Sequence, residues 1–538
     1  MKTSRLILGD QLNARHSWFQ TVSDDVVYVM MEIRQETDYA YHHVQKVIAF
    51  FLAMRHFADE RRAEGHTVVY LDLDDPANTQ SLTRNLQQII TNYERSGSPV
   101  SRFEYLLPDE LRLDQQLKTF ASGLSIPAQA VDTEHFYTTR DELARFYSRP
   151  SGGAKNFVME FFYRALRRKH HVLMEGDSGP DSQPVTGRWN YDEENRNPLP
   201  KSLPILPPRL YKREVQNIHG LLVKQGVQMM GTVDTSHFIW PVTREEYVEM
   251  IAFFCANCLP VFGTYQDGMS ADAWSLYHSR LSFGMNSKLI SPKEVVDAAV
   301  DYYLNHQDTV SYAQIEGFVR QILGWREYMR GIYWAKMPEF AHLNYFDHQA
   351  KLPGFYWDGK TKANCLHHAV DHSLRYAYSH HIQRLMITGN FALLAGVHPD
   401  EVDAWYLGVY IDAIEWVEIT NTRGMSQHAD GGIVGTKPYV SSAAYINKMS
   451  NFCKSCHYDK DKKIESGEPT TSKAKSAPNR PPCPFNSLYW DFYDRHRAKL
   501  ERNPRVGMMY KTWDRMTPEV KEATLRQANW YKEHLDEI

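Results

Sequence analysis

Cysteine is scarce in this chain, with 6 among 538 residues. So few thiols exclude the dense disulfide framework of a small secreted protein. In a reducing cytoplasm, clustered cysteines indicate metal or redox chemistry more often than disulfides. The six are Cys255, Cys258, Cys365, Cys453, Cys456 and Cys483.

An excess of charge of one sign is also missing, because 61 Lys and Arg residues stand against 65 Asp and Glu residues. This balance excludes a surface that binds polyanions over its whole area, and leaves room for a local basic groove. We find no run of about twenty apolar residues, and the opening MKTSRLILGD lacks the layout of a signal peptide. We therefore expect a soluble cytoplasmic protein that does not cross a membrane.

The N-terminal third lacks the glycine-rich dinucleotide fingerprint, since Gly9 stands alone after the apolar run 5–8. Strand-like and helical segments nevertheless alternate here, and the helix predicted over 44–65 ends at Gly65, a common C-terminal stop. This alternation predicts a parallel sheet covered by helices, with ligands beyond the carboxyl ends of the strands. The other predicted strands are 25–31, 67–73 and 102–107.

Residues 130–235 contain few of the apolar runs that predict strands. The pattern predicts an amphipathic helix over 158–170 that carries Arg164, Arg167 and Arg168, followed by a connector rich in Pro, Gly and Asn over 176–208. A basic run of this kind is more often a solvated helix face than a nucleic-acid contact. From residue 240 onward the 3.6-residue period predicts helices over 243–258, 291–305, 311–334, 362–380, 381–395, 399–412 and 511–536.

The two C-x-x-C pairs differ in their surroundings. Cys255 and Cys258 lie at the apolar end of a predicted helix, where buried cysteines behave as small hydrophobic residues. The pair at 453 and 456 lies in a polar stretch, with Cys483-Pro484 beyond a segment, 459–482, that we expect to be mobile. Cys365 could supply a fourth thiolate, and spacing alone leaves zinc and a [4Fe–4S] cluster equally open.

Three helical stretches resemble the flavin-binding core of the photolyase/cryptochrome superfamily. The resemblance is closest to its iron–sulfur branch, the bacterial cryptochromes and prokaryotic (6-4) photolyases, and it covers essentially the whole chain. The stretches are IEGFVRQILGWREYMRGIYW (315–334), YAYSHHIQRLMITGNFALLAG (376–396) and WYLGVYIDAIEWVE (405–418). Shorter matches are GDQL (9–12), RWNYDEEN (188–195), GMSQHADGG (424–432) and GTKPY (435–439).

This resemblance implies a Rossmann-like α/β antenna domain and a large all-α FAD-binding domain with a C-terminal iron–sulfur module. The implied boundaries are 1–130 for the antenna domain, 131–235 for the linker, 236–445 for the FAD domain and 446–538 for the module. It also implies a [4Fe–4S] cluster, and leaves Cys255 and Cys258 structural. The implied cluster ligands are Cys365, Cys453, Cys456 and Cys483, although the gap between the last two is longer than is usual in the family.

The family also implies the FAD contacts. Arg384 and Asp412 match the pair at the flavin ring, and Glu418 falls near the position that faces flavin N5, where many relatives carry Asn. That difference could change how the flavin is protonated during reduction. The remaining implied contacts are Gly263, Thr264, Ser279, Leu281, Ser282, Gln321, Trp325 and Arg326.

Aromatic and histidine residues carry the implied photochemistry. Trp405, Tyr406 and Trp357 match an electron relay to the flavin. The alternative interpretation is that each is an ordinary aromatic residue of the hydrophobic core. His381, with His380 beside it, matches the proton donor that (6-4) repair requires, while the position of a second histidine in eukaryotic enzymes holds Leu385. The implied contacts to flipped-out, UV-damaged DNA are Tyr439, Tyr445, Asp192, Arg164 and Arg168.

The resemblance implies an antenna pocket at the end of the first strand. Gly9, Asp10, Gln11, Glu36 and Tyr39 match the residues that hold 6,7-dimethyl-8-ribityllumazine in this branch. A deazaflavin or a folate fills the pocket in other members of the superfamily.

Three functions are consistent with the sequence. The first is a monomeric (6-4) photolyase that repairs UV-damaged DNA, and the second is a cryptochrome-type blue-light photoreceptor of the same fold. The third is an iron–sulfur nucleic-acid-binding protein without photochemistry. A flavin spectrum would remove the third, and repair of an irradiated oligonucleotide would separate the first two.

Overall fold

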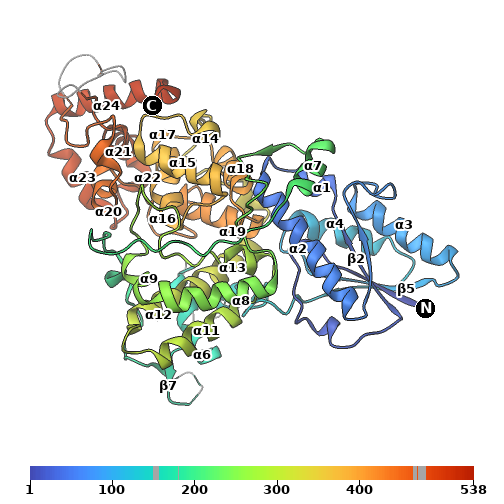
Figure 1. Cartoon of the computed structure of the whole chain (residues 1–538). Helices are drawn as coiled ribbons and strands as arrows, with labels where there is room; N and C mark the ends of the chain where they lie inside the picture. The colour runs from blue at the N-terminus through green and yellow to red at the C-terminus, as the bar shows by residue number, and fades with distance from the viewer. Residues whose placement is uncertain (149–156, 178, 180, 465–468, 470–479) are drawn as a thin grey trace.

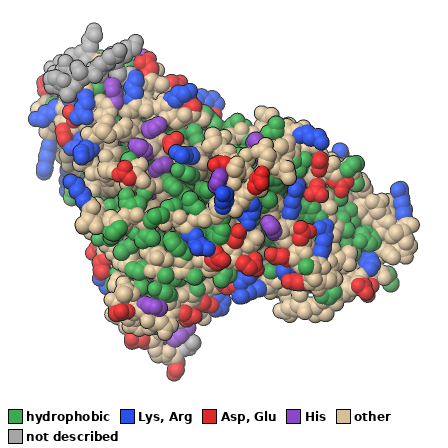
Figure 2. Space-filling model, in the orientation of Figure 1, with side chains coloured by type: hydrophobic (Ala, Val, Ile, Leu, Met, Phe, Trp, Pro, Cys, Tyr) green, Lys and Arg blue, Asp and Glu red, His purple; other side chains and the backbone are tan. Residues whose placement is uncertain are grey.

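An α/β unit, a helical body and a C-terminal helical module follow one another along the molecule (Figure 1). This computed structural model describes residues 1–148, 157–177, 179, 181–464, 469 and 480–538. The expectation of mobility over 459–482 falls largely on residues outside this set. Basic and acidic side chains are interspersed over the face shown in Figure 2, as the near-neutral charge balance predicts.

Five parallel strands form the sheet of the α/β unit, in the order β4-β2-β1-β5-β6. Its helices include α2 (Val44–Ala63), α3 (Leu82–Arg95) and α4 (Leu111–Ser122). The strand order reverses at β1, which creates a crevice beyond the carboxyl ends of β1 and its neighbours. The strands are β1 (Lys2–Leu6), β2 (Val26–Met31), β4 (Thr67–Leu71), β5 (Val100–Leu106) and β6 (Ala128–Val131).

The parallel sheet is as predicted, and α2 ends where expected, with Gly65 at φ +96°. The strand β6 was not predicted, because its residues lie on the exposed edge of the sheet and carry no buried apolar run. It ends at Val131 and therefore crosses the expected domain boundary at residue 130.

The segment expected to lack strands contains three short ones. β9 (Met229–Met230) pairs in parallel with β3 (His42–His43), which ties this segment back to the α/β unit. β7 (Met174–Glu175) and β8 (Gln183–Pro184) form a separate antiparallel pair. The helix α6 (Met159–His170) precedes β7, and the 3₁₀ turn η3 (Asp192–Asn195) and α7 (Gln216–Lys224) lie between β8 and β9.

The helical body contains π-helical turns, which bulge the helix locally and are frequent at functional sites. Three of them, η4 (Phe254–Cys258), η5 (Arg320–Arg326) and η7 (Arg384–Gly389), lie inside helices that the sequence predicts as continuous. Another, η8 (Thr420–Ser426), lies in a segment for which no helix was predicted. The main α-helices are α8 (Arg244–Phe253), α9 (Leu259–Tyr265), α10 (Ser282–Asn286), α11 (Pro292–Asn305), α12 (Tyr312–Val319), α13 (Glu327–Lys336), α14 (Phe355–Asp358), α15 (Asn364–Tyr376), α16 (His381–Gln383), α17 (Asn390–Ala395), α18 (Pro399–Val409) and α19 (Glu415–Ile419).

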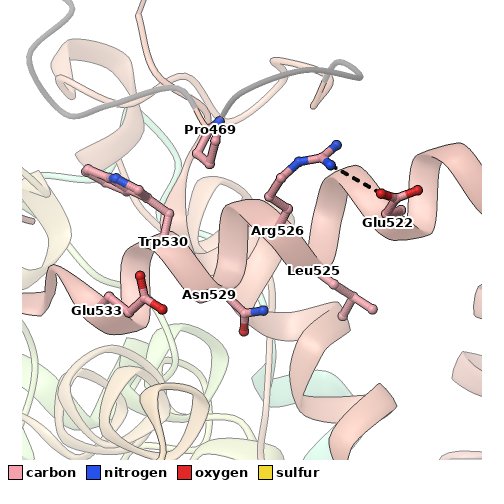
Figure 3. Close-up of a pocket in the computed structure, with 7 residues that line it drawn as sticks. All are labelled: Pro469, Glu522, Leu525, Arg526, Asn529, Trp530 and Glu533. Carbon is pink, nitrogen blue, oxygen red and sulfur yellow. Dashed lines mark hydrogen bonds and ion pairs between the residues drawn. The ribbon is translucent and has the colours of Figure 1, made fainter.

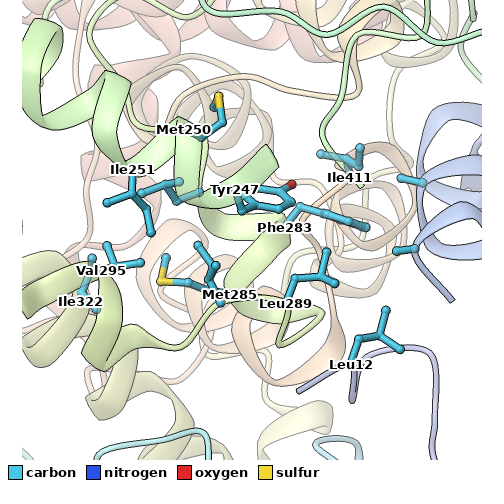
Figure 4. Packing of buried hydrophobic residues seen from close by; sticks show 14 of the residues in the cluster. Leu12, Tyr247, Met250, Ile251, Phe283, Met285, Leu289, Val295, Ile322 and Ile411 are labelled. Carbon is cyan, nitrogen blue, oxygen red and sulfur yellow. The ribbon is translucent and has the colours of Figure 1, made fainter. Parts of the chain in front are cut away.

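One core joins the α/β unit to the helical body. Leu12, from the loop after β1, belongs to the same buried cluster as Tyr247 and Phe283 (Figure 4). Gly284 is required in this packing, because a Cβ atom there would lie 2.6 Å from the Tyr247 ring. The Leu12 backbone N–H also donates to the Ser287 carbonyl at 2.9 Å. The two units are therefore packed as one body.

One helical stretch in the described residues, Arg244–Tyr265, is long and apolar enough to cross a membrane by length and composition. It was not predicted from the sequence, because it contains no uninterrupted run of about twenty apolar residues. Half of this stretch is buried inside the protein, as in a core helix.

The C-terminal module shares one buried cluster with α14, α15, α17 and α18 of the helical body. Its helices are α20 (Ala443–Met449), α21 (Pro484–Arg495), α22 (Arg497–Leu500), α23 (Gly507–Asp514) and α24 (Pro518–Glu533). The prediction of one helix over 511–536 was wrong. Thr517 is extended and caps α24, and Pro518 has no N–H to continue the preceding helix.

Candidate functional site

Three histidines converge at the N-terminus of α16. The side-chain nitrogens of His278, His380 and His381 lie within 4.8 Å of one another. The rings of His278 and His380 stack at 4.5 Å, and His278 meets His381 edge-on at 5.3 Å. The structure thus brings the two predicted histidines together with His278, which the sequence did not single out because it lies in an irregular segment before α10.

The two predicted histidines differ in their environments. His380 is fully buried, and neither of its ring nitrogens has a hydrogen-bond partner among the residues that the structure describes. Burial, together with the neighbouring His278, holds its pKa well below the ordinary value, so this imidazole is neutral. The His381 side chain is 47 % exposed, and its Nε2 lies 3.7 Å from Asp267 Oδ1. His381 is therefore the better placed of the two to carry a proton.

Two tyrosines flank the same region. Burial raises the pKa of Tyr439, and the carboxylate of Asp192 adds to this effect. Burial also raises the pKa of Tyr445, with a contribution from Asp267, the neighbour of His381. Arg196 interacts electrostatically with Asp192, Asp267, Tyr439 and Tyr445, so these groups lie in one region. We call this region, with His381 beside Asp267, the mouth. Asp192 is itself paired with Arg196, four residues further along the chain.

An arginine and an aspartate form the polar centre beneath this mouth. Arg384 bonds both carboxylate oxygens of Asp412, at 3.0 and 3.2 Å, and its guanidinium lies 3.8 Å from the Tyr410 ring centroid. Ser282 Oγ donates to Asp412 Oδ2 at 2.6 Å. Arg384 is the first residue of η7, so a π-helical turn orients the guanidinium.

A second layer supports Asp412. Asn286 Nδ2 donates to the Asp412 carbonyl at 2.7 Å, and Arg326 Nη2 donates to Asn286 Oδ1 at 3.1 Å. Arg326 is buried and lies 4.9 Å from the Trp416 ring centroid. Sequence reasoning missed Asn286, although it lies only four residues after Ser282, one of the implied FAD contacts.

Gly263 and Thr264 serve the packing of α9 against α12. The Thr264 backbone and hydroxyl both bond the Gln314 amide, at 3.0 and 2.6 Å. A Cβ on Gly263 would lie 2.9 Å from Gln314 Oε1 and 3.1 Å from Asn195 Oδ1. Asn195 closes η3, so this close packing also fixes the turn that carries Asp192.

The other predicted FAD contacts are spread over two elements. Ser279 and the buried Leu281 precede α10. Gln321 and Trp325 are half-buried on η5, where Gln321 Nε2 donates to the Gly317 carbonyl at 3.2 Å. No direct contact to Arg384 or Asp412 is seen for these four among the described residues.

Glu418 is a buried acid near this centre. Burial raises its pKa well above the ordinary value, and Asp403 adds to the effect, so the carboxyl is neutral. Its Oε1 has no hydrogen-bond partner in the described part of the chain. Burial also lowers the pKa of Lys46 to about 7, against an opposing contribution from Asp412.

The predicted relay aromatics lie on α18 and α14. Tyr406 Oη donates to the Arg384 carbonyl at 2.7 Å, which connects α18 to the polar centre. Trp405 is fully buried, and its Nε1 donates to the Tyr356 carbonyl at 2.9 Å. Trp357 follows Tyr356 in the chain and is 44 % exposed. The three residues therefore extend from the centre to the surface.

Four cysteines from three segments line one small void. Cys365 comes from α15, Cys453 and Cys456 from the turn after α20, and Cys483 from the N-cap of α21. All six cysteines are free thiols. Cys255 and Cys258 lie elsewhere, on the π-helical turn η4, where both are buried in the hydrophobic core.

A cavity of about 150 Å³ opens at the switch point of the sheet. The segments after β1, β2 and β5 contribute Asp10, Glu36 and Glu110, and the helical body contributes Glu415. Tyr39 also lines this cavity, with the Arg112 guanidinium 4.5 Å from its ring centroid.

Glu36 and Asp10 are already held by basic side chains. Arg112 bonds both carboxylate oxygens of Glu36, at 3.0 and 2.8 Å, and Lys288 lies 3.3 Å from Asp10 Oδ2. Gln11 does not line the cavity. Its amide bonds the backbone of Leu8 and Leu106 at 2.9 and 3.2 Å, so it ties the loops after β1 and β5 together.

The predicted phosphate-binding arginines pack on an indole ring. Arg164 and Arg168 lie 5.3 and 4.6 Å from the Trp189 ring centroid. Arg164 is also paired with Glu160 at 2.8 Å. The contacts with Trp189 hold the connector against α6. Phosphate binding by Arg164 and Arg168 stays a prediction.

A further surface pocket lies on α24 (Figure 3). On this helix the pocket is lined by Trp530, Arg526 and Glu522, and Pro469 lies opposite. The side chains of Arg526 and Glu522 form an ion pair at 3.3 Å. The pocket contains none of the predicted site residues.

Known proteins resemble this chain over its whole length. A family model described as deoxyribodipyrimidine photo-lyase-related protein matches residues 5–238. The chain is 39% identical over 539 residues to a (6-4) photolyase of Agrobacterium fabrum, and the match covers 99% of each protein.

Solved structures share the fold. A bacterial class III photolyase from Agrobacterium tumefaciens matches with a TM-score of 0.57 at 13% identity, over 93% of this chain and 97% of its own. A cryptochrome from Synechocystis sp. matches with a TM-score of 0.50 at 13% identity, over 79% and 82%. The predicted fold class is confirmed, and membership implies a flavin cofactor. By its full-length identity, the chain belongs to the photolyase family that includes the (6-4) photolyase of Agrobacterium fabrum.

Proposed function

We propose that this protein is a light-dependent DNA repair enzyme, a (6-4) photolyase that reverses pyrimidine–pyrimidone (6-4) photoproducts using FAD. The observation that carries this proposal is the exposed His381, paired with Asp267, three residues before Arg384 of the half-buried Arg384–Asp412 centre. Such an arrangement supplies a proton donor next to a polar site that can hold a flavin. The relative named (6-4) photolyase supports the same activity.

The residues at the centre fit a flavin. Arg384 and Asp412 offer a donor and an acceptor side by side, and the unpartnered Oε1 of the neutral Glu418 adds a further polar group. A buried polar atom without a protein partner is the kind of group that a polar ligand satisfies. Bound FAD, reduced and excited by light, would supply one electron to the lesion.

The remaining chemistry belongs to the protein. Tyr439 and Tyr445 would stack on the two bases of the extruded lesion, because their aromatic faces border the mouth. His381 would donate its Nε2 proton to the group that moves between the bases, and Asp267 would stabilise the protonated imidazole. His380, neutral and buried, would orient its neighbours instead of supplying this proton.

Repair of a defined lesion tests the proposal. Purified protein with reduced flavin should repair an oligonucleotide that carries one (6-4) photoproduct under blue light and not in the dark. Activity on a cyclobutane dimer alone would contradict the choice of lesion. Light-driven flavin reduction without repair of either lesion would favour a photoreceptor.

The four converging cysteines fit a [4Fe–4S] cluster. Burial raises the pKa of Cys453 to about 11 and that of Cys365 further, so thiolates at this site would need a cationic centre to stabilise them. We further propose that the cavity at the switch point holds 6,7-dimethyl-8-ribityllumazine, whose ring would face Tyr39 while its hydroxyls meet Asp10 and Glu36. Monomeric state and cytoplasmic location stay predictions.

Replacing Trp405 with Phe should leave FAD bound and nearly abolish its photoreduction, since phenylalanine is far harder to oxidise than tryptophan. Absorbance of the flavin under blue light with an added thiol measures this. Chemically reduced Trp405→Phe protein should still repair. Photoreduction at the wild-type rate would show that Trp405 is only a core residue.

Replacing Tyr39 with Ala should weaken retention of the antenna chromophore. Loss of an aromatic face in the cavity removes about 1 kcal/mol, which corresponds to a roughly fivefold higher Kd. Chromophore released by denaturation, identified by mass and counted per protein, measures this. Tyr302→Ala on α11, outside the cavity, should retain the wild-type amount. Recovery of a folate alone would contradict the assignment of the ligand.

A further inference from the structure

Two exposed aromatic rings from different units meet at the surface. Tyr41, in the segment between α1 (Arg34–Thr37) and β3, is 45% exposed, and Trp357 on α14 is 44% exposed. Their ring centroids lie 5.9 Å apart with a 40° tilt. Large aromatic side chains that are this exposed are unusual in the protein, and here two of them touch.

The backbone of Tyr41 is held against α18. A Cβ atom on Gly408 would lie 2.2 Å from the Tyr41 carbonyl oxygen, so only glycine permits this approach. Lys46 Nζ donates to the neighbouring Leu407 carbonyl at 2.7 Å. The helix that carries Trp405 and Tyr406 therefore also fixes the position of Tyr41.

Trp357 is the link between Tyr41 and the interior. The Trp405 indole donates to the Tyr356 carbonyl and meets the Tyr356 ring edge-on at 5.1 Å. Trp357 is the next residue in the chain. Aromatic side chains thus follow one another from Trp405 on α18, through the adjacent Tyr356 and Trp357 on α14, to the exposed Tyr41.

We propose that Tyr41 is the terminal electron donor of the relay, an inference that rests on the proposed photolyase function. When Trp357 has passed one electron inward toward the photoexcited flavin, Tyr41 gives one electron to the oxidised indole. Its phenolic proton goes to water, which leaves a neutral tyrosyl radical. An external thiol then returns one electron and one proton. The positive charge on the oxidised Trp357 is thereby removed, so the electron that moved inward from Trp357 cannot easily return to it.

Access to water sets Tyr41 apart from the buried tyrosines near the relay. Tyr356 and Tyr406 donate their hydroxyl protons to the Thr388 and Arg384 carbonyls, at 2.7 Å in each case. Burial raises the pKa of both hydroxyls well above the ordinary value. Oxidation of a buried tyrosine would leave its proton without a solvent acceptor, whereas the Tyr41 proton can leave directly.

The test is the identity of the radical after a light pulse, followed by transient absorption and electron paramagnetic resonance on the flavin-loaded protein. We expect a tyrosyl signal in the wild type, its loss in Tyr41→Phe, and its loss in Trp357→Phe, where the pathway is interrupted. Tyr302→Phe is the matched control and should keep the signal.

The outcomes separate this inference from the function on which it rests. Tyr41→Phe that is chemically reduced beforehand should repair (6-4) photoproducts at the wild-type rate. An undiminished tyrosyl signal in Tyr41→Phe, or none in the wild type, would overturn the role of Tyr41 while repair stays intact. Absence of repair by reduced wild-type protein would instead overturn the proposed function.

Discussion

His381→Ala should bind damaged DNA and photoreduce normally, yet repair (6-4) photoproducts at a rate lower by roughly 10²-fold or more. The reason is that repair must move an oxygen-containing group between two bases, which requires a proton as well as an electron. His381 is exposed to the mouth beside Asp267, whereas His380 is buried and neutral. Rates on a single-lesion oligonucleotide measure the loss.

His237→Ala is the control for this variant, because His237 is an exposed histidine paired with Asp234 outside the site. It should repair at the wild-type rate. Normal (6-4) repair by His381→Ala, with lesion binding intact, would refute the assignment of the proton donor.

Cys453→Ala should yield little soluble protein, and what is recovered should lack iron. Three thiolates would hold the cluster poorly, and the segments around α15, α20 and α21 would lose the link between them. Iron and sulfide analysis of the purified protein measures the occupancy.

Cys258→Ala is the control, since this thiol is buried on η4 and lies outside the group of four converging cysteines, whereas Cys453 is half-buried within that group. It should lose about 1 kcal/mol of stability and keep a full complement of iron. Equal loss of iron in the two variants would contradict the choice of ligands.

Periodicity was enough to predict the main elements, because strands covered on both faces and long amphipathic helices leave strong apolar patterns. It failed where an element buries little, as at the exposed edge strand β6. It also failed where one residue interrupts a periodic run, as Pro518 does between α23 and α24.

The candidate site was less accessible to sequence reasoning. Arg384 and Asp412 were identified only through the family resemblance, since 28 positions separate them and only the fold brings them into contact. His278 and Asp267 gave no periodic signal, because they lie in irregular segments. Gln11 illustrates the opposite error: it adjoins a pocket residue in the chain, but its amide is fully used by the backbone.

The cavity at the switch point has walls from both the α/β unit and the helical body, through Glu415 and its neighbours. Any ligand of this cavity must therefore favour the state in which the two units are docked over a state in which they have separated. By mass action, occupancy at a hundredfold excess over Kd would strengthen docking by about 2.7 kcal/mol. The fluorescence of a bound chromophore would accordingly report interdomain assembly, and it should disappear at the first separation of the units during unfolding.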